Sequence, residues 1–155
     1  MEIEITQEIL EICNAILQSY KDELSYDGIN ASNKLSDTAT YNCQWRGKYF
    51  EIYFNLQEYW KYIENGTRAH FPPIAPIEEW IKVKKLVPRQ YNGNIPTTKQ
   101  LAYMVSKKIS KEGTEGKYPL KLSMNKANDN GLFDLLANAL IDSMNKEIDK
   151  EIDNL

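Results

Sequence analysis

Hydrophobic positions near the start of the chain repeat with the period of an α-helix. The repeat takes in Ile5, Ile9, Ile12, Cys13, Ile16, Leu17, Tyr20 and Leu24. This spacing places the apolar side chains on one helical face. Thr6 or a neighbouring residue is the expected cap, and Glu8 lies in the first turn, where an acidic residue is favoured. We expect this first helix to end before a polar loop marked by Asp27-Gly28 and by residues 30–33.

The pattern then changes from helical to alternating, which predicts a β-hairpin over about residues 38–55. One face of the first run carries Ala39, Tyr41, Cys43 and Trp45, and one face of the second carries Phe50, Ile52 and Phe54. Arg46-Gly47-Lys48 between the runs favours a tight turn. Because an isolated hairpin is barely stable in water, we expect it to pack on the first helix.

A short aromatic helix follows the hairpin. Leu56, Tyr59, Trp60 and Ile63 fall at i, i+3, i+4 and i+7 on one face, and Gly66 is expected to end the helix in a left-handed conformation. Pro72 and Pro73 restrict the backbone of the residues before them to extended conformations. We call residues 66–73 the elbow and expect Arg68 and His70 to be exposed there.

Three further segments read as two helices and a strand. Pro76 is the expected first residue of a short helix with Ile77, Trp80 and Ile81 on its inner face. After a turn-rich connector over 88–94, Thr97 and Gln100 match a capping box, and the helix with Leu101, Val105 and Ile109 is expected to stop at Gly113. Residues 116–122 read as an extended edge segment because of Pro119, and 125–131 as a loop.

The last hydrophobic stripe predicts a peripheral C-terminal helix over 131–153. Its members are Leu132, Leu136, Leu140, Met144, Ile148 and Ile152. A strict four-residue step drifts by about 40° per step around a 3.6-residue helix, so the stripe leaves any straight seam. We therefore expect part of this helix to contact the domain, and the rest to contact a partner or to fray.

Length and composition indicate one domain covering residues 1–155. At 155 residues the chain is long enough for a real core, and 42% hydrophobic with 26% charged residues is close to globular averages. We expect Trp45, Phe50 or Phe54, Trp60, Ile63 and Trp80 to meet Ile9, Ile12 and Ile16 in one core. Ten tyrosines and three tryptophans exceed what packing needs, and such residues are enriched at interfaces.

The charge balance weighs against a dedicated nucleic-acid-binding protein. The formal net charge is −3 and the isoelectric point is near 5.3, whereas phosphate binding needs a basic face. Two lysine clusters keep a nucleic-acid-binding accessory protein as an alternative: Lys82, Lys84 and Lys85, and Lys107, Lys108 and Lys111. Both clusters lie near helix C-termini, where lysine is also favoured by the helix dipole.

No pattern for catalysis, metal binding or cofactor binding is present. His70 is the only histidine, and Cys13 and Cys43 are widely separated and expected to be reduced. Phosphate-loop, nucleophile-elbow and zinc-protease motifs are missing. A small enzyme with an unrecognised site remains a third hypothesis. The first residues also lack the basic and apolar regions of a signal peptide, and no apolar stretch is long enough to span a membrane, so we expect a cytosolic product.

The order of motifs over about residues 36–120 resembles the neck and tail-completion proteins of tailed bacteriophages. These motifs are the hairpin, Tyr59-Trp60-Lys61-Tyr62-Ile63-Glu64-Asn65-Gly66-Thr67-Arg68, Phe71-Pro72-Pro73, Glu79-Trp80-Ile81, Pro96-Thr97 with Lys99-Gln100-Leu101-Ala102, and Lys111-Glu112-Gly113-Thr114. In that family a Pro-Phe pair often follows the last Gly-Thr. Here Tyr118-Pro119-Leu120 stands in its place.

The resemblance implies an α+β fold with an N-terminal helix packed on a small antiparallel sheet, further short helices and a C-terminal helix. It also implies a non-catalytic virion protein that forms a homo-oligomeric ring at the head–tail junction, made in the host cytoplasm. The partners would be portal, neck or tail proteins, with no membrane and only incidental DNA contact in the ring lumen. We place the subunit interface at the elbow and the segment after Gly113-Thr114, on Arg68, His70, Phe71, Pro72, Pro73 and Tyr118.

Overall fold

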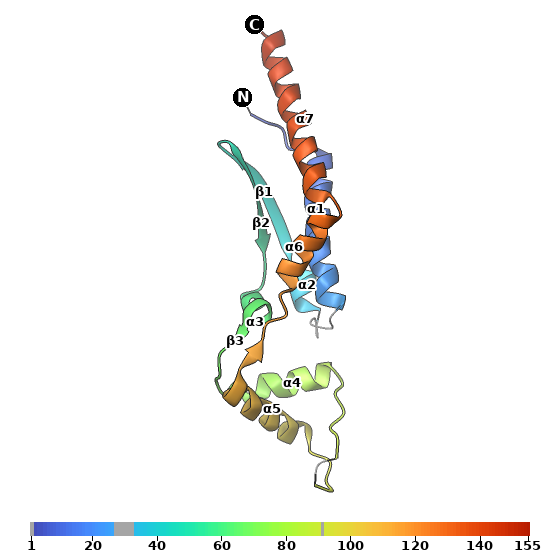
Figure 1. Ribbon diagram of the computed structural model, residues 1–155, viewed down its shortest axis with the longest axis vertical. Helices are drawn as coiled ribbons and strands as arrows, with labels where there is room; N and C mark the ends of the chain where they lie inside the picture. Colours follow the sequence, from blue (N-terminus) through green and yellow to red (C-terminus); the bar gives the residue numbers. More distant parts are fainter. Residues whose placement is uncertain (1, 27–32, 91) are drawn as a thin grey trace.

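The computed structural model describes residues 2–26, 33–90 and 92–155. It is an α+β protein whose chain order is α1 (Gln7–Tyr26), α2 (Lys34–Thr38), β1 (Thr40–Arg46), β2 (Tyr49–Asn55), α3 (Trp60–Asn65), β3 (Gly66–Thr67), α4 (Ile74–Val83), α5 (Thr98–Glu112), β4 (Thr114–Glu115), α6 (Pro119–Asp129) and α7 (Leu132–Asp153). The molecule is elongated, with both termini at one end and α4 and α5 at the other (Figure 1).

We call α4, α5 and the residues around them, 68–112, the lobe, and we call the remainder the body. In the body, α6 and α7 pack along α1, and the hairpin of β1 and β2 packs on the same helix. The two strands pair antiparallel, with Tyr41 opposite Phe54 and Trp45 opposite Phe50, around a two-residue turn. The expected α+β fold is confirmed, including the N-terminal helix on the hairpin. The loop expected at 27–33 lies outside the described residues except for Asn33.

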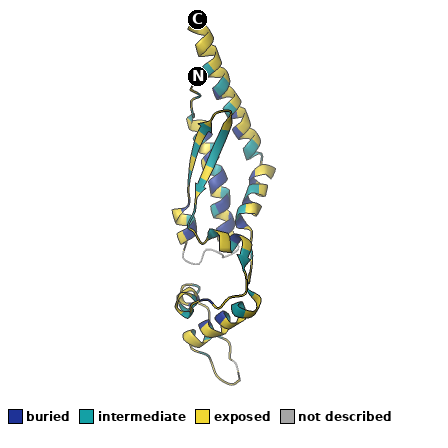
Figure 2. Ribbon diagram, turned by 90° about the vertical axis from the view of Figure 1, so that its left-hand side faces the viewer, coloured by how far each residue is buried: buried dark blue, intermediate teal, exposed yellow. Residues whose placement is uncertain are grey.

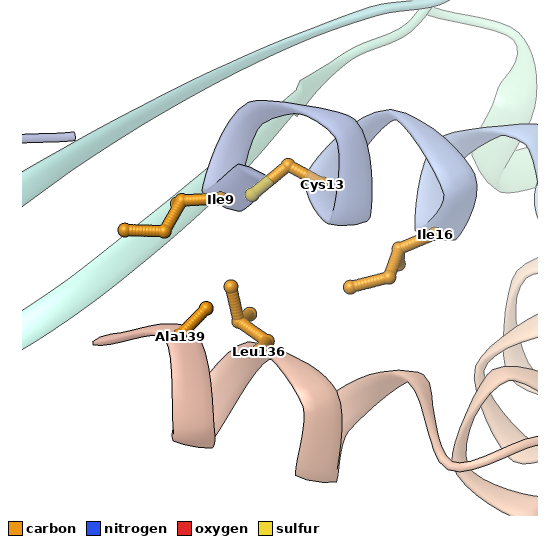
Figure 3. Close-up of a cluster of buried hydrophobic side chains, with 5 residues drawn as sticks. All are labelled: Ile9, Cys13, Ile16, Leu136 and Ala139. Atoms are coloured by element: carbon orange, nitrogen blue, oxygen red, sulfur yellow. The ribbon is translucent and has the colours of Figure 1, made fainter. Parts of the chain in front are cut away.

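The expected face of α1 is buried. Ile9, Cys13 and Ile16 form a first core cluster with Leu136 and Ala139 of α7 (Figure 3). Phe50, Ile52 and Phe54 of the hairpin pack against this cluster. Thr6 caps the helix weakly, since its hydroxyl accepts from the Ile9 amide at 3.4 Å. Tyr41 of β1 also donates its hydroxyl proton to the carbonyl of Leu10 at 2.8 Å, which joins the hairpin to α1.

A second core cluster lies at the other end of α1, so the expectation of one shared core is wrong. Leu17, Tyr20 and Leu24 meet Leu35 and Ala39 there, with Trp60 and Ile63 packed against them. Trp80 belongs to the lobe and is 41% exposed, because α4 turns Ile81 inward instead. The exposed residues dominate the lobe and the far end of α7 (Figure 2).

Two helix starts differ from the sequence expectation. α3 begins at Trp60 because the preceding residues form a turn in which the Trp60 amide donates to the carbonyl of Gln57 at 2.9 Å. α4 begins at Ile74, after Pro73, so that Pro76 is its third residue. The first four amides of a helix have no internal partner, so a proline there removes no hydrogen bond.

The largest difference from the sequence expectation concerns residues 116–131, which we expected to form an extended segment and a loop. They contain α6, which begins at Pro119 and runs to Asp129. Proline is favoured at the first helical position, but no local side chain caps this helix. Its cap comes from Glu64, 56 residues earlier in the chain, as described below.

α7 occupies the predicted C-terminal segment and divides into two parts. Leu136 and Ala139 near its start are buried in the first cluster, and Ser143 donates its hydroxyl proton to the carbonyl of Glu4. Beyond that contact the helix projects past the hairpin (Figure 1), and Ile148 and Ile152 are exposed. The capping box of α5 is confirmed: Gln100 and Thr97 exchange two side-chain hydrogen bonds, of 2.8 and 3.2 Å.

Candidate subunit interface

The elbow begins at a two-stranded ribbon that joins the body to the lobe. Gly66 and Thr67 of β3 pair antiparallel with Glu115 and Thr114 of β4. The hydroxyl oxygens of the two threonines lie 2.9 Å apart, within hydrogen-bonding distance. Gly66 does have a positive φ, of 74°, but its ψ of −171° lies outside the left-handed helical region that the sequence predicted. This conformation is open essentially only to glycine.

Glycines allow the two chains of the ribbon to approach closely. A Cβ atom added to Gly66 would lie 2.1 Å from the carbonyl oxygen of Thr114, and one added to Gly113 would lie 2.2 Å from that of Thr67. One added to Gly116 would lie 2.4 Å from the carbonyl oxygen of Glu64. The Gly-Thr pairs of the two motifs are therefore structural, because they bring the two ends of the lobe segment together.

Glu64 has an internal role as well. Its buried carboxylate accepts the amide protons of Leu120 at 2.8 Å and of Lys121 at 3.0 Å, and so caps the N-terminus of α6. A negative charge at this end of a helix is also favoured by the helix dipole. Glu64 belongs to the aromatic signature but was not assigned a role from sequence. The only local signal was Pro119, which is suited to a first helical position.

Four of the six expected interface residues are exposed on the lobe side of the ribbon: Arg68, His70, Phe71 and Pro73. The Nδ1 atom of His70 lies 2.8 Å from the carbonyl oxygen of Arg68. The amide of His70 donates to the carbonyl of Ile109 at 3.4 Å, which joins the elbow to α5. The ring of Phe71 lies against the ring of Tyr103, with a centroid separation of 6.0 Å. These contacts position the elbow, and they leave the guanidinium of Arg68 exposed.

The remaining two expected residues differ from the other four. Pro72 is buried within the subunit, so its side chain is part of the internal packing of the lobe. Tyr118 is exposed as well, but it lies beyond β4, at the N-terminus of α6, where Lys121 approaches its ring to 5.9 Å. Its φ of 52° is left-handed, and its amide donates to the carbonyl of Glu64 at 3.2 Å. The elbow and Tyr118 therefore flank the ribbon from the lobe and from the body.

No group of histidine, cysteine, aspartate and glutamate suited to hold a metal occurs among the described residues. Burial raises the pKa of the Cys13 thiol to about 12, with Cys43 nearby, so it is a poor nucleophile at neutral pH. No helix within the described ranges is long and apolar enough to cross a membrane.

The lysine clusters are partly neutralised. Lys82 pairs with Glu78 at 3.0 Å, and Lys108 lies 4.0 Å from Glu112. The lobe nevertheless has an excess of positive charge: residues 68–112 contain nine Lys and Arg against three Asp and Glu, or +6. The rest of the chain contains ten Lys and Arg against nineteen Asp and Glu, which gives a net charge of −9. The small overall charge of −3 thus conceals a strong separation of charge between lobe and body.

Comparison with known proteins finds no counterpart for this chain. No protein-family model, no curated protein and no solved structure matches it.

Proposed function

We propose that this chain is a structural virion protein that forms a ring at the head–tail junction of a tailed bacteriophage. It would act there as a neck or tail-completion protein, without catalysis, and would contact neighbouring copies and the portal, neck or tail proteins next to it. The proposal rests mainly on the exposure and rigidity of the elbow. The elbow presents exposed Arg68, His70 and Phe71 on a rigid support that the glycine ribbon and the prolines hold in place.

Physical properties of the elbow support a docking role. A rigid segment loses little conformational entropy on binding. An exposed arginine can make two parallel hydrogen bonds to a carboxylate of a neighbour, and an aromatic ring adds contact area. Glu64 and Gly66 also belong to the motifs that carry the resemblance. Their contacts lie within the subunit and explain how the elbow is built.

The proposal is tested first in the virus. We expect a phage that lacks this chain to accumulate heads and tails that do not join, and we expect the chain to be found at the neck of intact particles by immunogold electron microscopy. Normal joined particles without the chain would contradict the proposal. So would localisation of the chain away from the head–tail junction.

A point variant then tests the elbow. Arg68→Ala removes the exposed guanidinium and should reduce the yield of joined particles at least about tenfold, as truncation of an interface hot spot does. The isolated subunit should keep its stability to within about 0.5 kcal/mol, because Arg68 is exposed. Arg46→Ala is the matched control, because Arg46 is exposed at the end of β1 and lies outside the elbow. An unchanged yield with Arg68→Ala would remove the elbow from the interface.

A further inference from the structure

More than half of the exposed large apolar side chains among the described residues lie in the lobe or in and just beyond α7. Of the large hydrophobic residues that are exposed among the described residues, eight lie in the lobe: Phe71, Trp80, Val83, Leu86, Val87, Ile95, Tyr103 and Met104. Four lie from the middle of α7 to just beyond its end, at Ile141, Ile148, Ile152 and Leu155, and Leu135 lies near its start. Figure 1 places the lobe at one end of the molecule and the projecting part of α7 at the other. Such concentrations of apolar surface mark interaction sites.

The apolar surface of the lobe includes a groove. The groove has a volume of about 620 Å³ and lies between the start of α4, the connector and the first half of α5. Its walls include Ile74, Pro96, Tyr103 and Met104, with Lys99 and Gln100 as polar groups. A groove of this composition suits the apolar face of a helix, with the lysine at its edge suited to an acidic group on the same helix.

The outer side of α7, from the turn that contains Ser143 into the projecting part, has a face that fits this description. Ile141, Ile148 and Ile152 are separated by seven and four residues, so they lie on one side of the helix. This side is opposite to Ser143, which contacts the body. The three isoleucines span about 16 Å at 1.5 Å per residue. α7 thus has one face that packs in its own subunit and a second face that no described residue covers.

The charges of the two ends are complementary. Residues 144–153 of α7 carry Glu147, Asp149, Glu151 and Asp153 against two lysines, so this part of the helix is acidic. The lobe carries +6, and the lysines at 99, 107, 108 and 111 all belong to α5. Opposite charge steers two surfaces together and selects their orientation. A nucleic acid would match the charge of the lobe, but it would leave the apolar face of α7 uncovered.

We propose that the outer face of α7 in one copy of this chain docks into the α4–α5 groove of a second copy. The contact is head-to-tail, because different surfaces of the two copies meet. Contacts of this type close into a ring or continue as a filament, depending on the rotation between neighbours. As a source of contacts between ring neighbours, the interaction rests on the proposed function, but it is measurable on the isolated protein.

Sedimentation velocity over a range of protein concentrations tests the contact. The wild-type chain should associate as the concentration rises. Ile152→Asp on α7 and Met104→Asp in the groove should each weaken association at least about tenfold, because each places a carboxylate in the apolar contact. Both side chains are exposed in the subunit, so both variants should keep its fold. Tyr49→Asp, at an exposed position of β2 outside both surfaces, is the matched control and should associate like the wild type.

Charge reversal tests the pairing of the two surfaces. Asp149→Lys with Asp153→Lys should weaken association, and so should Lys99→Glu with Lys107→Glu. In a mixture of these two double variants, the unchanged α7 of one variant meets the unchanged groove of the other, and the two reversed surfaces again carry opposite charges, so the mixture should associate. Restored association in the mixture, and in neither variant alone, supports the proposal.

Three results would overturn it. The first is a wild-type chain that stays monomeric at every concentration tested. The second is association that Ile152→Asp and Met104→Asp leave unchanged. The third is a lobe that binds double-stranded DNA in a salt-dependent way while the chain remains monomeric. These failures differ from failure of the proposed function, which is decided by where the chain lies in the particle.

Discussion

The body and the lobe bury their apolar residues to very different extents. In the body, α1 contributes Ile9, Cys13 and Leu24 with no exposed surface at all, and two clusters extend along its length. In the lobe, Ile81 and Ala102 are the buried hydrophobic residues of the two helices, and most of the larger side chains remain exposed. Both regions have ordinary amphipathic helices, so the difference lies in what each helix packs against.

The comparison indicates how the two regions divide their roles. The body has enough buried apolar area to hold its own fold, since burial is the main favourable contribution to folding. The lobe is a pair of helices on a two-stranded ribbon, and its remaining apolar surface is available to a partner.

Gly66→Ala should have the largest effect, because it acts where the body and the lobe join. The strain of a positive φ costs about 1–3 kcal/mol, and the clash with the Thr114 carbonyl adds about 1–3 kcal/mol. Gly93→Ala is the matched control: its φ is also positive, at 81°, but nothing lies within 4 Å of the added Cβ atom. Denaturant unfolding should show the larger loss for Gly66→Ala. Equal losses would mean that close approach in the ribbon is unimportant.

Ile16→Ala and Ile81→Ala compare the two cores directly. Both side chains are almost fully buried, and truncation of a buried isoleucine costs about 2–5 kcal/mol. We expect Ile16→Ala to lower the free energy of global unfolding by this amount. Ile81→Ala should instead raise amide hydrogen exchange in α4 and α5 and leave protection in α1 nearly unchanged. A general loss of protection with Ile81→Ala would show that the lobe and the body unfold as one unit.

Alkaline pH should destabilise the body through Tyr20. Burial, then the nearby charge of Glu64, raises the pKa of this phenol from 10.0 to about 12. The unfolded chain therefore loses this proton near pH 10 and the folded chain only near pH 12, so the stabilisation is complete below pH 10 and lost between pH 10 and 12. At about 1.4 kcal/mol per pKa unit, the loss is about 2–3 kcal/mol.

Denaturant titrations from pH 9 to 12 measure this loss, and Tyr20→Phe is the control because it removes the titrating hydroxyl. The variant should show a smaller decline over the same range. The Cys13 thiol, whose pKa is also raised, contributes equally to both proteins and cancels in the difference. Identical pH profiles for the two proteins would contradict the assignment.

Glu64→Ala should have the smallest of these effects. It removes the cap of α6 and leaves two amides without their carboxylate partner, at a cost of about 1–3 kcal/mol. Glu58→Ala, at an exposed position just before α3, should change the free energy of unfolding by no more than about 0.5 kcal/mol. Far-ultraviolet circular dichroism with denaturant provides both values. A loss for Glu64→Ala no greater than that for Glu58→Ala would remove Glu64 as a cap.

Local patterns in the sequence were sufficient for much of the secondary structure. The period of α1, the alternation of the hairpin, the capping box at Thr97 and Gln100, and the helix at 132–153 all depend on neighbours within about four residues. The forces that stabilise such elements act over the same distance along the chain. The exposure of Arg68 and His70 was also predictable, because a stiff proline turn with polar residues has little apolar surface to bury.

The tertiary structure decided what depends on residues far apart in sequence. Residues 119–129 form a helix because Glu64 lies where it caps them, and no neighbouring residue carries that information. Gly66, Gly113 and Gly116 are required because two chain segments cross within van der Waals contact. Trp80 faces outward and Pro72 inward for a similar reason. The local pattern does not decide which side of a helix or turn faces the core, and tertiary packing selects that side. The positive charge of residues 68–112 can be counted from the sequence, but only the fold places that segment at one end of the molecule.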